Sequence, residues 1–192
     1  MKRLLIIILL IGNTVLAQQQ ALRPGDLLFY SDTAGMGSAV RESTGEYTHV
    51  ALVAEVGDTV WIVDATQRHG VSRRPFLRRQ ESSGKPHPDI YRLTVPFDTA
   101  EVIARAIRLI GKPYDNAFLP DNGAYYCSEL IQAAFGDLFP SAPMNWRDKD
   151  GNLPQYWQEH FKKLGMPVPE GVMGTTTTSL SQSKLLRTIN HY

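Results

Sequence analysis

The sequence predicts an α+β fold in which antiparallel strands occupy the middle of the chain and helices lie before and after them. Two stretches rich in β-branched residues, 48–56 and 59–66, flank a Gly-Asp dipeptide that is typical of a two-residue hairpin turn. Two later stretches, 98–114 and 127–138, carry apolar residues at the spacing of a helix. Together these observations predict an antiparallel sheet against which helices pack.

The first 17 residues have the pattern of a secretory signal peptide. Lys2 and Arg3 form a basic start, an apolar run follows over 4–11, and small residues stand at the positions before a cleavage site after Ala17. We therefore expect an exported, periplasmic or extracellular protein whose mature chain starts near Gln18. The apolar run is shorter than the about 20 residues that span a bilayer, and no cysteine directly follows the cleavage site, so we expect no stable membrane anchor.

Residues 18–192 have the size and composition of a single globular domain. The chain is 43% hydrophobic and 20% charged, with a formal net charge of +1. This balance argues against a nucleic-acid partner and against an anionic membrane surface. The threonine-rich stretch 175–179 is interpreted as a surface segment. A run of arginines is interpreted as a solvated loop face: Arg68, Arg73, Arg74, Arg78 and Arg79.

The other elements follow from local patterns and from turn residues. The expected strands are 25–30, 70–76 and 88–94, and the expected short or amphipathic helices are 35–45, 153–165 and 179–188. Gly111 and Pro113 end the helix that begins near residue 98, and Gly136 ends the helix that begins at Cys127.

Cys127 is the only cysteine of the chain and lies in the first turn of its expected helix. Exported proteins use cysteines in pairs, so an unpaired one is either a small buried side chain or a reactive thiol. The positive end of a helix dipole and its free N–H groups favour the thiolate form. The same N–H groups can hold an oxyanion. Packing and nucleophilic interpretations both remain open on this evidence alone.

A thiolate nucleophile needs a base, and the base needs an orienting group. Of the five histidines, His49 begins a strand, which is a rigid place from which to direct an imidazole. Solvated or packing roles are expected for the other four: His69, His87, His160 and His191.

The expected hairpin brings a carboxylate next to His49. With Gly57-Asp58 as the loop, Ala51 lies opposite Asp64, His49 opposite Thr66 and Glu55 opposite Val60. His49 and Asp64 are then diagonal neighbours on one face of the sheet, although a slip of one residue would turn Asp64 away. The residues thus predict Cys127, His49 and Asp64 as nucleophile, base and orienting group, in a triad defined by geometry and not by chain order.

Five segments in this order resemble a known family: "GDLLFY", "YTHVALV", "WIVDAT..HGV", "GKPYDNAF" and "YYCSELI". They are similar to the NlpC-type papain-like cysteine peptidases, and more narrowly to the circularly permuted YiiX/YebB-like branch, in which the histidine strands precede the cysteine helix. The resemblance extends over about residues 22–140 and implies a permuted papain-like fold with a Cys-His-acid triad. Cys127 and His49 match the nucleophile and base, and Asp64 matches a position associated with Glu in this branch.

The resemblance implies further residues around the site. Tyr114 is expected to help the oxyanion, and Glu129 is expected to make either a structural contact or a contact with a substrate amine. The full set of expected substrate-binding or oxyanion residues is Tyr114, Asp115, Tyr126, Ser128 and Glu129. No metal is expected, because ligand spacings for zinc are absent from the sequence. The expected reaction needs no organic cofactor.

Export and the resemblance together predict a cysteine hydrolase that cleaves an amide bond in cell-wall (murein) peptides or related short peptides. One alternative is an acyltransferase or lipid hydrolase related to lecithin retinol acyltransferase. Such proteins tend to have a second histidine in the role of Asp64 and a membrane-anchoring segment, and neither is expected in the mature chain. The other alternative is a binding module that has lost catalysis, against which the intact Cys127, His49 and Asp64 argue. The sequence does not indicate the oligomeric state.

Overall fold

The computed structural model describes residues 22–76 and 88–190. Its main sheet has six antiparallel strands in the order β4-β3-β2-β1-β5-β8. These strands are β1 (Leu27–Tyr30), β2 (His49–Glu55), β3 (Trp61–Thr66), β4 (Gly70–Pro75), β5 (Asp89–Leu93) and β8 (Leu186–Asn190). The α+β class is confirmed, whereas the expected signal peptide, residues 1–17, lies outside the described residues.

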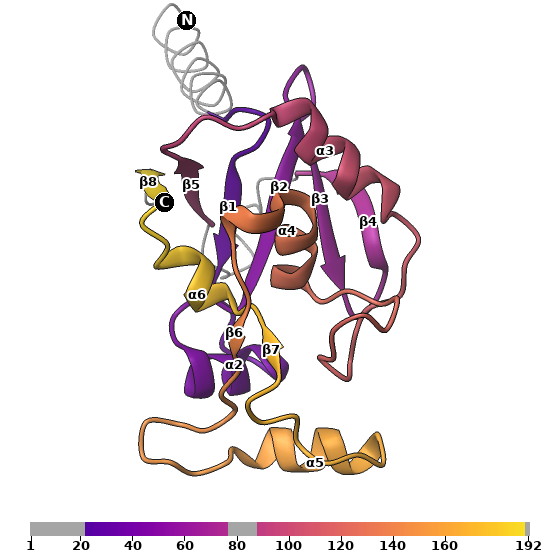
Figure 1. The fold of residues 1–192 in the computed structure, drawn as a ribbon, viewed down its shortest axis with the longest axis vertical. Coiled ribbons are helices and arrows are strands. Elements are labelled where there is room, and N and C mark those ends of the chain that lie inside the picture. The colour runs from indigo at the N-terminus through magenta and orange to yellow at the C-terminus, as the bar shows by residue number, and fades with distance from the viewer. Residues whose placement is uncertain (1–21, 77–87, 191–192) are drawn as a thin grey trace, which may run out of the picture.

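Two helices cover one face of this sheet, and a smaller lobe lies beyond its end. The helices in the described residues are α2 (Met36–Thr44), α3 (Thr99–Arg108), α4 (Cys127–Phe135), α5 (Gln155–Lys163) and α6 (Thr177–Ser181), with a 3₁₀ turn η2 (Gly136–Leu138) after α4. The two that cover the sheet are α3 and α4. Figure 1 shows α3 and α4 in front of the sheet, with α2, α5 and the ribbon of β6 (Ala142–Pro143) and β7 (Met173–Gly174) gathered below. None of the helices in the described ranges has the length and apolar composition needed to cross a bilayer.

Alternating side chains of β2 divide the core between the two faces of the sheet. Val50 and Leu52 belong to the cluster that includes Leu130 and Ile131 of α4. Ala51, between them, belongs to the cluster on the other face. The apolar stripe of α4 therefore packs on the face of β2 that carries Val50 and Leu52. Cys127, the first residue of α4, lies near the start of β2.

The smaller lobe is built around aromatic side chains that pack edge to face. Trp146 and Trp157 lie with ring centroids 4.8 Å apart, and Phe118 lies 5.1 Å from the Trp146 ring. Trp157 Nε1 donates a hydrogen bond to Ser43 Oγ at 3.1 Å, and Ser43 Oγ donates to the carbonyl oxygen of Trp146 at 2.8 Å. These bonds tie α2 to α5 and to the segment of Trp146. The Phe118 ring also lies 5.1 Å from the ring of Tyr126, at the start of α4.

The hairpin between β2 and β3 differs from the expected two-residue turn. The strands stop at Glu55 and resume at Trp61, and a bulge after Val53 pairs Glu55 with Trp61 in place of Val60. Leu52 still lies opposite Val63, which is the expected register. A bulge changes the pairs on one side of it only, so the register toward His49 is unchanged.

Two expectations near the C-terminus are wrong. Helix α6 ends at Ser181, and 186–190 form β8, because these residues complete the edge of the sheet with Leu186 opposite Leu93. The threonine segment does not lie on the surface throughout: Thr175 and Thr177 are only 2% and 3% exposed, whereas Ser179 is exposed. Their burial comes from contacts with distant segments, which local polarity does not indicate.

The turn between β3 and β4 holds the chain that leads to Tyr114. Gly70 has a φ of +62°, and a Cβ at this position would lie 2.3 Å from the carbonyl oxygen of Lys112. The same carbonyl accepts a hydrogen bond from the Val71 N–H at 2.9 Å. The close approach of the two segments therefore requires glycine.

We expect Gly70→Ala to lower the free energy of unfolding by about 2 kcal/mol, because it adds both a strained φ and a clash with backbone. Gly57→Ala is the matched control, since no atom lies within 4 Å of the added Cβ. The control should change stability by no more than about 0.5 kcal/mol. Urea denaturation of the two variants measures this difference, and equal effects would contradict the close approach.

Candidate active site

Cys127 is the first residue of α4, and Tyr126 caps the helix with extended backbone. The first hydrogen bond of the helix runs from the Leu130 N–H to the Tyr126 carbonyl at 3.0 Å. The N–H groups of the first turn, including that of Cys127, therefore have no acceptor within the helix. The thiol is free and 7% exposed. A substrate carbonyl at this thiol would meet backbone donors that can hold an oxyanion.

His49 and Asp64 lie on adjacent antiparallel strands, β2 and β3, and form the expected contact. His49 Nε2 lies 2.9 Å from Asp64 Oδ2, with side-chain exposures of 24% and 0%. Because an ionised carboxylate only accepts hydrogen bonds, Nε2 carries a proton and donates a hydrogen bond to Asp64. The imidazole also interacts electrostatically with the Cys127 side chain, and Nδ1 is the ring nitrogen that Asp64 does not use. The arrangement is that of a nucleophile, a base and an orienting acid.

The environment sets opposite charges on His49 and Asp64. Burial by itself would lower the pKa of His49, but the interactions with Asp64 and Cys127 outweigh it and raise this pKa to about 10. Burial would raise the pKa of Asp64, but the hydrogen bonds from His49 and Arg74 lower it to about 2. At neutral pH the imidazole is therefore protonated and the carboxylate ionised. A protonated imidazole next to Cys127 can give its proton to a leaving group.

Arg74 is a part of this arrangement that the sequence analysis missed. Its Nε donates to Asp64 Oδ1 at 3.1 Å, and its terminal nitrogen donates to Oδ2. The interpretation of Arg74 as part of a solvated loop face is therefore wrong. Strand β4 places it beside Asp64, because Ser72 lies opposite Asp64 and side chains two apart share a face. Only the pairing of β3 with β4 shows that Arg74 lies beside Asp64.

Tyr114 lies beside the thiol, as the resemblance implied. Its Oη donates weakly to Met36 Sδ at 3.8 Å. Burial and the nearby charge of Cys127 raise the pKa of Tyr114 well above its ordinary value. The phenol is therefore protonated and is available as a hydrogen-bond donor to an oxyanion.

Tyr126 and Ser128 attach the start of α4 to the threonine segment. Ser128 Oγ donates to the carbonyl oxygen of Thr175 at 3.0 Å, and the Thr175 N–H donates to Tyr126 Oη at 3.2 Å. Tyr126 Oη in turn donates to Met144 Sδ at 3.5 Å. Both residues line the pocket next to Cys127, but their polar atoms are already engaged within the protein.

The carboxyl groups of Asp115 and Glu129 accept hydrogen bonds that shape the backbone. Asp115 accepts hydrogen bonds from the N–H groups of Ala117 and Leu119, both at 2.8 Å, across Phe118, whose φ is +54°. Glu129 Oε2 accepts from the Tyr126 N–H at 3.3 Å, and burial raises the pKa of Glu129 to about 8. Neither residue lines the pocket, so for Glu129 the geometry favours the structural contact.

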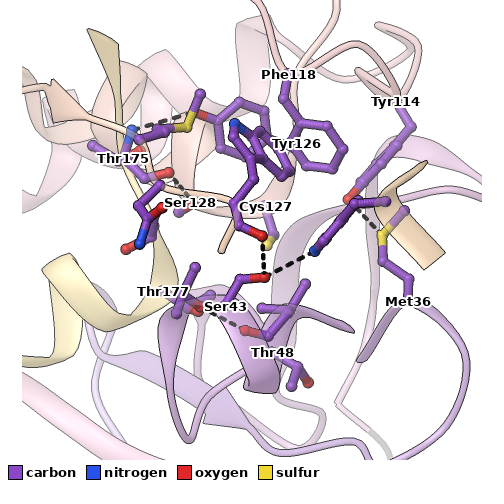
Figure 2. A pocket seen from close by; sticks show the side chains of 17 residues that line it. Met36, Ser43, Thr48, Tyr114, Phe118, Tyr126, Cys127, Ser128, Thr175 and Thr177 are labelled. Carbon is purple, nitrogen blue, oxygen red and sulfur yellow. Dashed lines mark hydrogen bonds between the residues drawn. The ribbon is translucent and has the colours of Figure 1, made fainter. Parts of the chain in front are cut away.

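A pocket opens beside Cys127 between α2, α4 and the threonine segment. Figure 2 shows Tyr114, Phe118 and Tyr126 on one side of Cys127 and Thr48 and Thr177 on the other. Across the two described ranges, His, Cys, Asp and Glu side chains form no group of three or more that could hold a metal ion.

Comparisons with known proteins identify the family and the fold. The model of the C92 family, described as permuted papain-like amidase enzymes of the YaeF/YiiX type, matches residues 21–190. The crystal structure of the metalloprotein YiiX from Escherichia coli O157:H7 is similar with a TM-score of 0.73 and 19% sequence identity, over 88% of this chain and 97% of that chain. Among curated proteins, none matches the sequence. The structural similarity supports the permuted papain-like fold.

The raised pKa of His49 gives a direct spectroscopic prediction. In the wild-type protein the His49 imidazole should remain protonated until the pH approaches about 10. Asp64→Asn and Cys127→Ser should each lower this pKa, because each removes a group that stabilises the imidazolium. NMR titration of the imidazole nitrogens measures the change.

The same shifts determine how stability depends on pH. The contribution of Asp64 is complete above its ordinary pKa of 3.8 and is lost as pH falls toward about 2. The contribution of His49 is complete below 6.5 and is lost as pH rises toward about 10. Wild type should therefore exceed Asp64→Asn in stability most clearly between these ordinary values. A His49 that titrates near 6.5 in the wild type would contradict the charged pair.

Proposed function

The chain belongs to the C92 family of permuted papain-like amidases, and from this premise we propose that it is an exported enzyme that hydrolyses an amide bond in cell-wall peptides or related short peptides. The proposed machinery is Cys127 as nucleophile, His49 as base and Asp64 as orienting acid. One observation carries this assignment: the His49 imidazole is hydrogen-bonded to Asp64 and interacts electrostatically with Cys127, the first residue of α4.

In the first half of the reaction the Cys127 thiolate attacks the substrate carbonyl carbon. The oxyanion that forms accepts hydrogen bonds from the Cys127 N–H and from Tyr114 Oη. His49 gives its Nδ1 proton to the amide nitrogen as the carbon–nitrogen bond breaks. The amine leaves, and the acyl group remains on Cys127 as a thioester.

In the second half His49 acts as a base toward water. Acylation removes the negative charge of the thiolate, which is one of the causes that raise the pKa of His49. The pKa of His49 therefore falls after acylation, and the imidazole can accept a proton from water. The water attacks the thioester, the acid product leaves and the thiolate is restored, while Asp64 holds the ring by Nε2 throughout.

The expected location and the chemistry of the thiol support the proposed substrate class. The basic and apolar start of the sequence supports export, and cell-wall peptides occur outside the cytoplasm. A second candidate is transfer or hydrolysis of a lipid acyl group by the same thiol, which the apolar lining of the pocket beside Cys127 favours. Parallel assays of short peptide amides and of lipid esters separate the two candidates. The first candidate predicts that peptide amides are the better substrates, and the second predicts that lipid esters are.

Replacement of the three residues should affect turnover unequally. Cys127→Ala should abolish hydrolysis, and His49→Ala should be nearly as damaging, because it removes both the proton donor and the base. Asp64→Asn should reduce kcat by about a hundredfold, which is a milder loss because the nucleophile and the oxyanion donors remain. The double variant at Cys127 and His49 should lose little more than either single variant.

Thr66→Val is the control for these variants. Thr66 lies at the end of β3, and its hydroxyl accepts only from the His69 N–H, at 3.2 Å, among the described contacts. Its replacement should leave hydrolysis unchanged. Release of free amine from short cell-wall-type peptides is the measurement. Peptide turnover that survives loss of Cys127 would contradict the mechanism, and ester-only turnover that requires Cys127 would favour the second candidate.

A further inference from the structure

We propose that the pocket beside Cys127 binds the acyl-side residue of the substrate and selects an uncharged apolar side chain. The inference rests on the proposed hydrolysis at Cys127. It adds the chemical class of the residue on the carbonyl side of the scissile bond and assigns Thr175 as a residue that binds it.

The position of the pocket identifies which half of the substrate it receives. Cys127 and Thr48 line the pocket, whereas His49 and Asp64 do not. In the mechanism above, His49 protonates the leaving amine, so the amine half must lie at the imidazole. The pocket lies on the remaining side of the thiol and therefore receives the group that stays bonded to Cys127.

The lining of the pocket selects against charge. It contains no Asp, Glu, Lys or Arg side chain, and most of its surface comes from apolar groups that include Met36, Val40, Phe118, Met144, Trp146 and Trp157. A charged side chain placed here would lose its hydration without gaining a partner. The cavity measures about 60 Å³, which is room for about four water-sized groups. The side chains of valine and leucine have this size and are apolar.

Thr175 supplies an unused polar group inside the same pocket. The residue is 2% exposed, and its Oγ1 has no hydrogen-bond partner. Its N–H and carbonyl are both engaged, with Tyr126 Oη and Ser128 Oγ, so the residue is held from both sides. A buried hydroxyl without a partner is unfavourable. The backbone amide that adjoins the substrate side chain is the polar group that would satisfy it.

Alkylation of Cys127 by chloromethyl ketones tests the selection without requiring turnover. The thiolate displaces chloride and forms a thioether, so labelling is read from the mass of the intact protein. The probes are the chloromethyl ketones of N-acetyl-leucine, N-acetyl-glutamate and N-acetyl-lysine, each normalised to iodoacetamide. The leucine reagent should label at least about tenfold faster than the two charged reagents. Rates within about twofold of one another, or faster labelling by a charged reagent, would overturn the proposal.

Thr175→Val tests the hydroxyl with little change of shape. Wild type should react several times faster with the N-acetyl-leucine reagent than with the analogue that lacks the acetamido group, and Thr175→Val should lose this preference. Thr178→Val is the matched control: Thr178 Oγ1 is also buried without a partner, but Thr178 does not line the pocket. An unchanged preference in Thr175→Val, or an equal loss in Thr178→Val, would refute the role of Thr175.

The outcomes separate this inference from the proposed function. If peptide amides are cleaved without need of Cys127, the proposed function fails whatever the labelling rates are. If cleavage requires Cys127 but the labelling rates do not depend on the charge of the acyl-side residue, the proposed function stands and the pocket assignment fails.

Discussion

Asp64 places a negative charge inside the sheet, and the site depends on how that charge is neutralised. The carboxylate has no exposed surface, and a buried charge without partners would strongly destabilise the fold. His49 from β2 and Arg74 from β4 supply the partners, one from each neighbouring strand. The same contacts orient the imidazole by Nε2 and keep it protonated. One electrostatic requirement thus couples the pairing of three strands to the state of the base.

The second requirement is that the start of α4 meets the start of β2. The segment Thr175–Thr177 joins them: Ser128 Oγ donates to the Thr175 carbonyl, and Thr177 Oγ1 donates to the carbonyl of Tyr47, two residues before His49. This segment also closes one side of the pocket at Cys127. Positioning of the nucleophile and shaping of the acyl-side pocket therefore depend on the same few hydrogen bonds.

The sequence predicts those parts of the site that depend on short-range patterns. Alternation along β2 and β3 indicates that His49 and Asp64 share a face, and this holds because the bulge lies on the turn side of the pair. Arg74 was missed because its role depends on the pairing of β4 with β3. The burial of Thr175 was missed because it arises from contacts with Tyr126 and Ser128 at the start of α4, far away along the chain. Patterns of polarity do not record such contacts.

The central claim is that hydrolysis proceeds through an acyl group on Cys127, and trapping that group tests it most directly. The protein is mixed with an N-acetyl-leucine anilide, quenched in acid and analysed by intact mass and peptide mapping. The account predicts an adduct with the mass of the acyl group on Cys127 that neutral hydroxylamine removes and that Cys127→Ala lacks. Hydrolysis with no adduct in the wild type, or with the adduct on another residue, would contradict it.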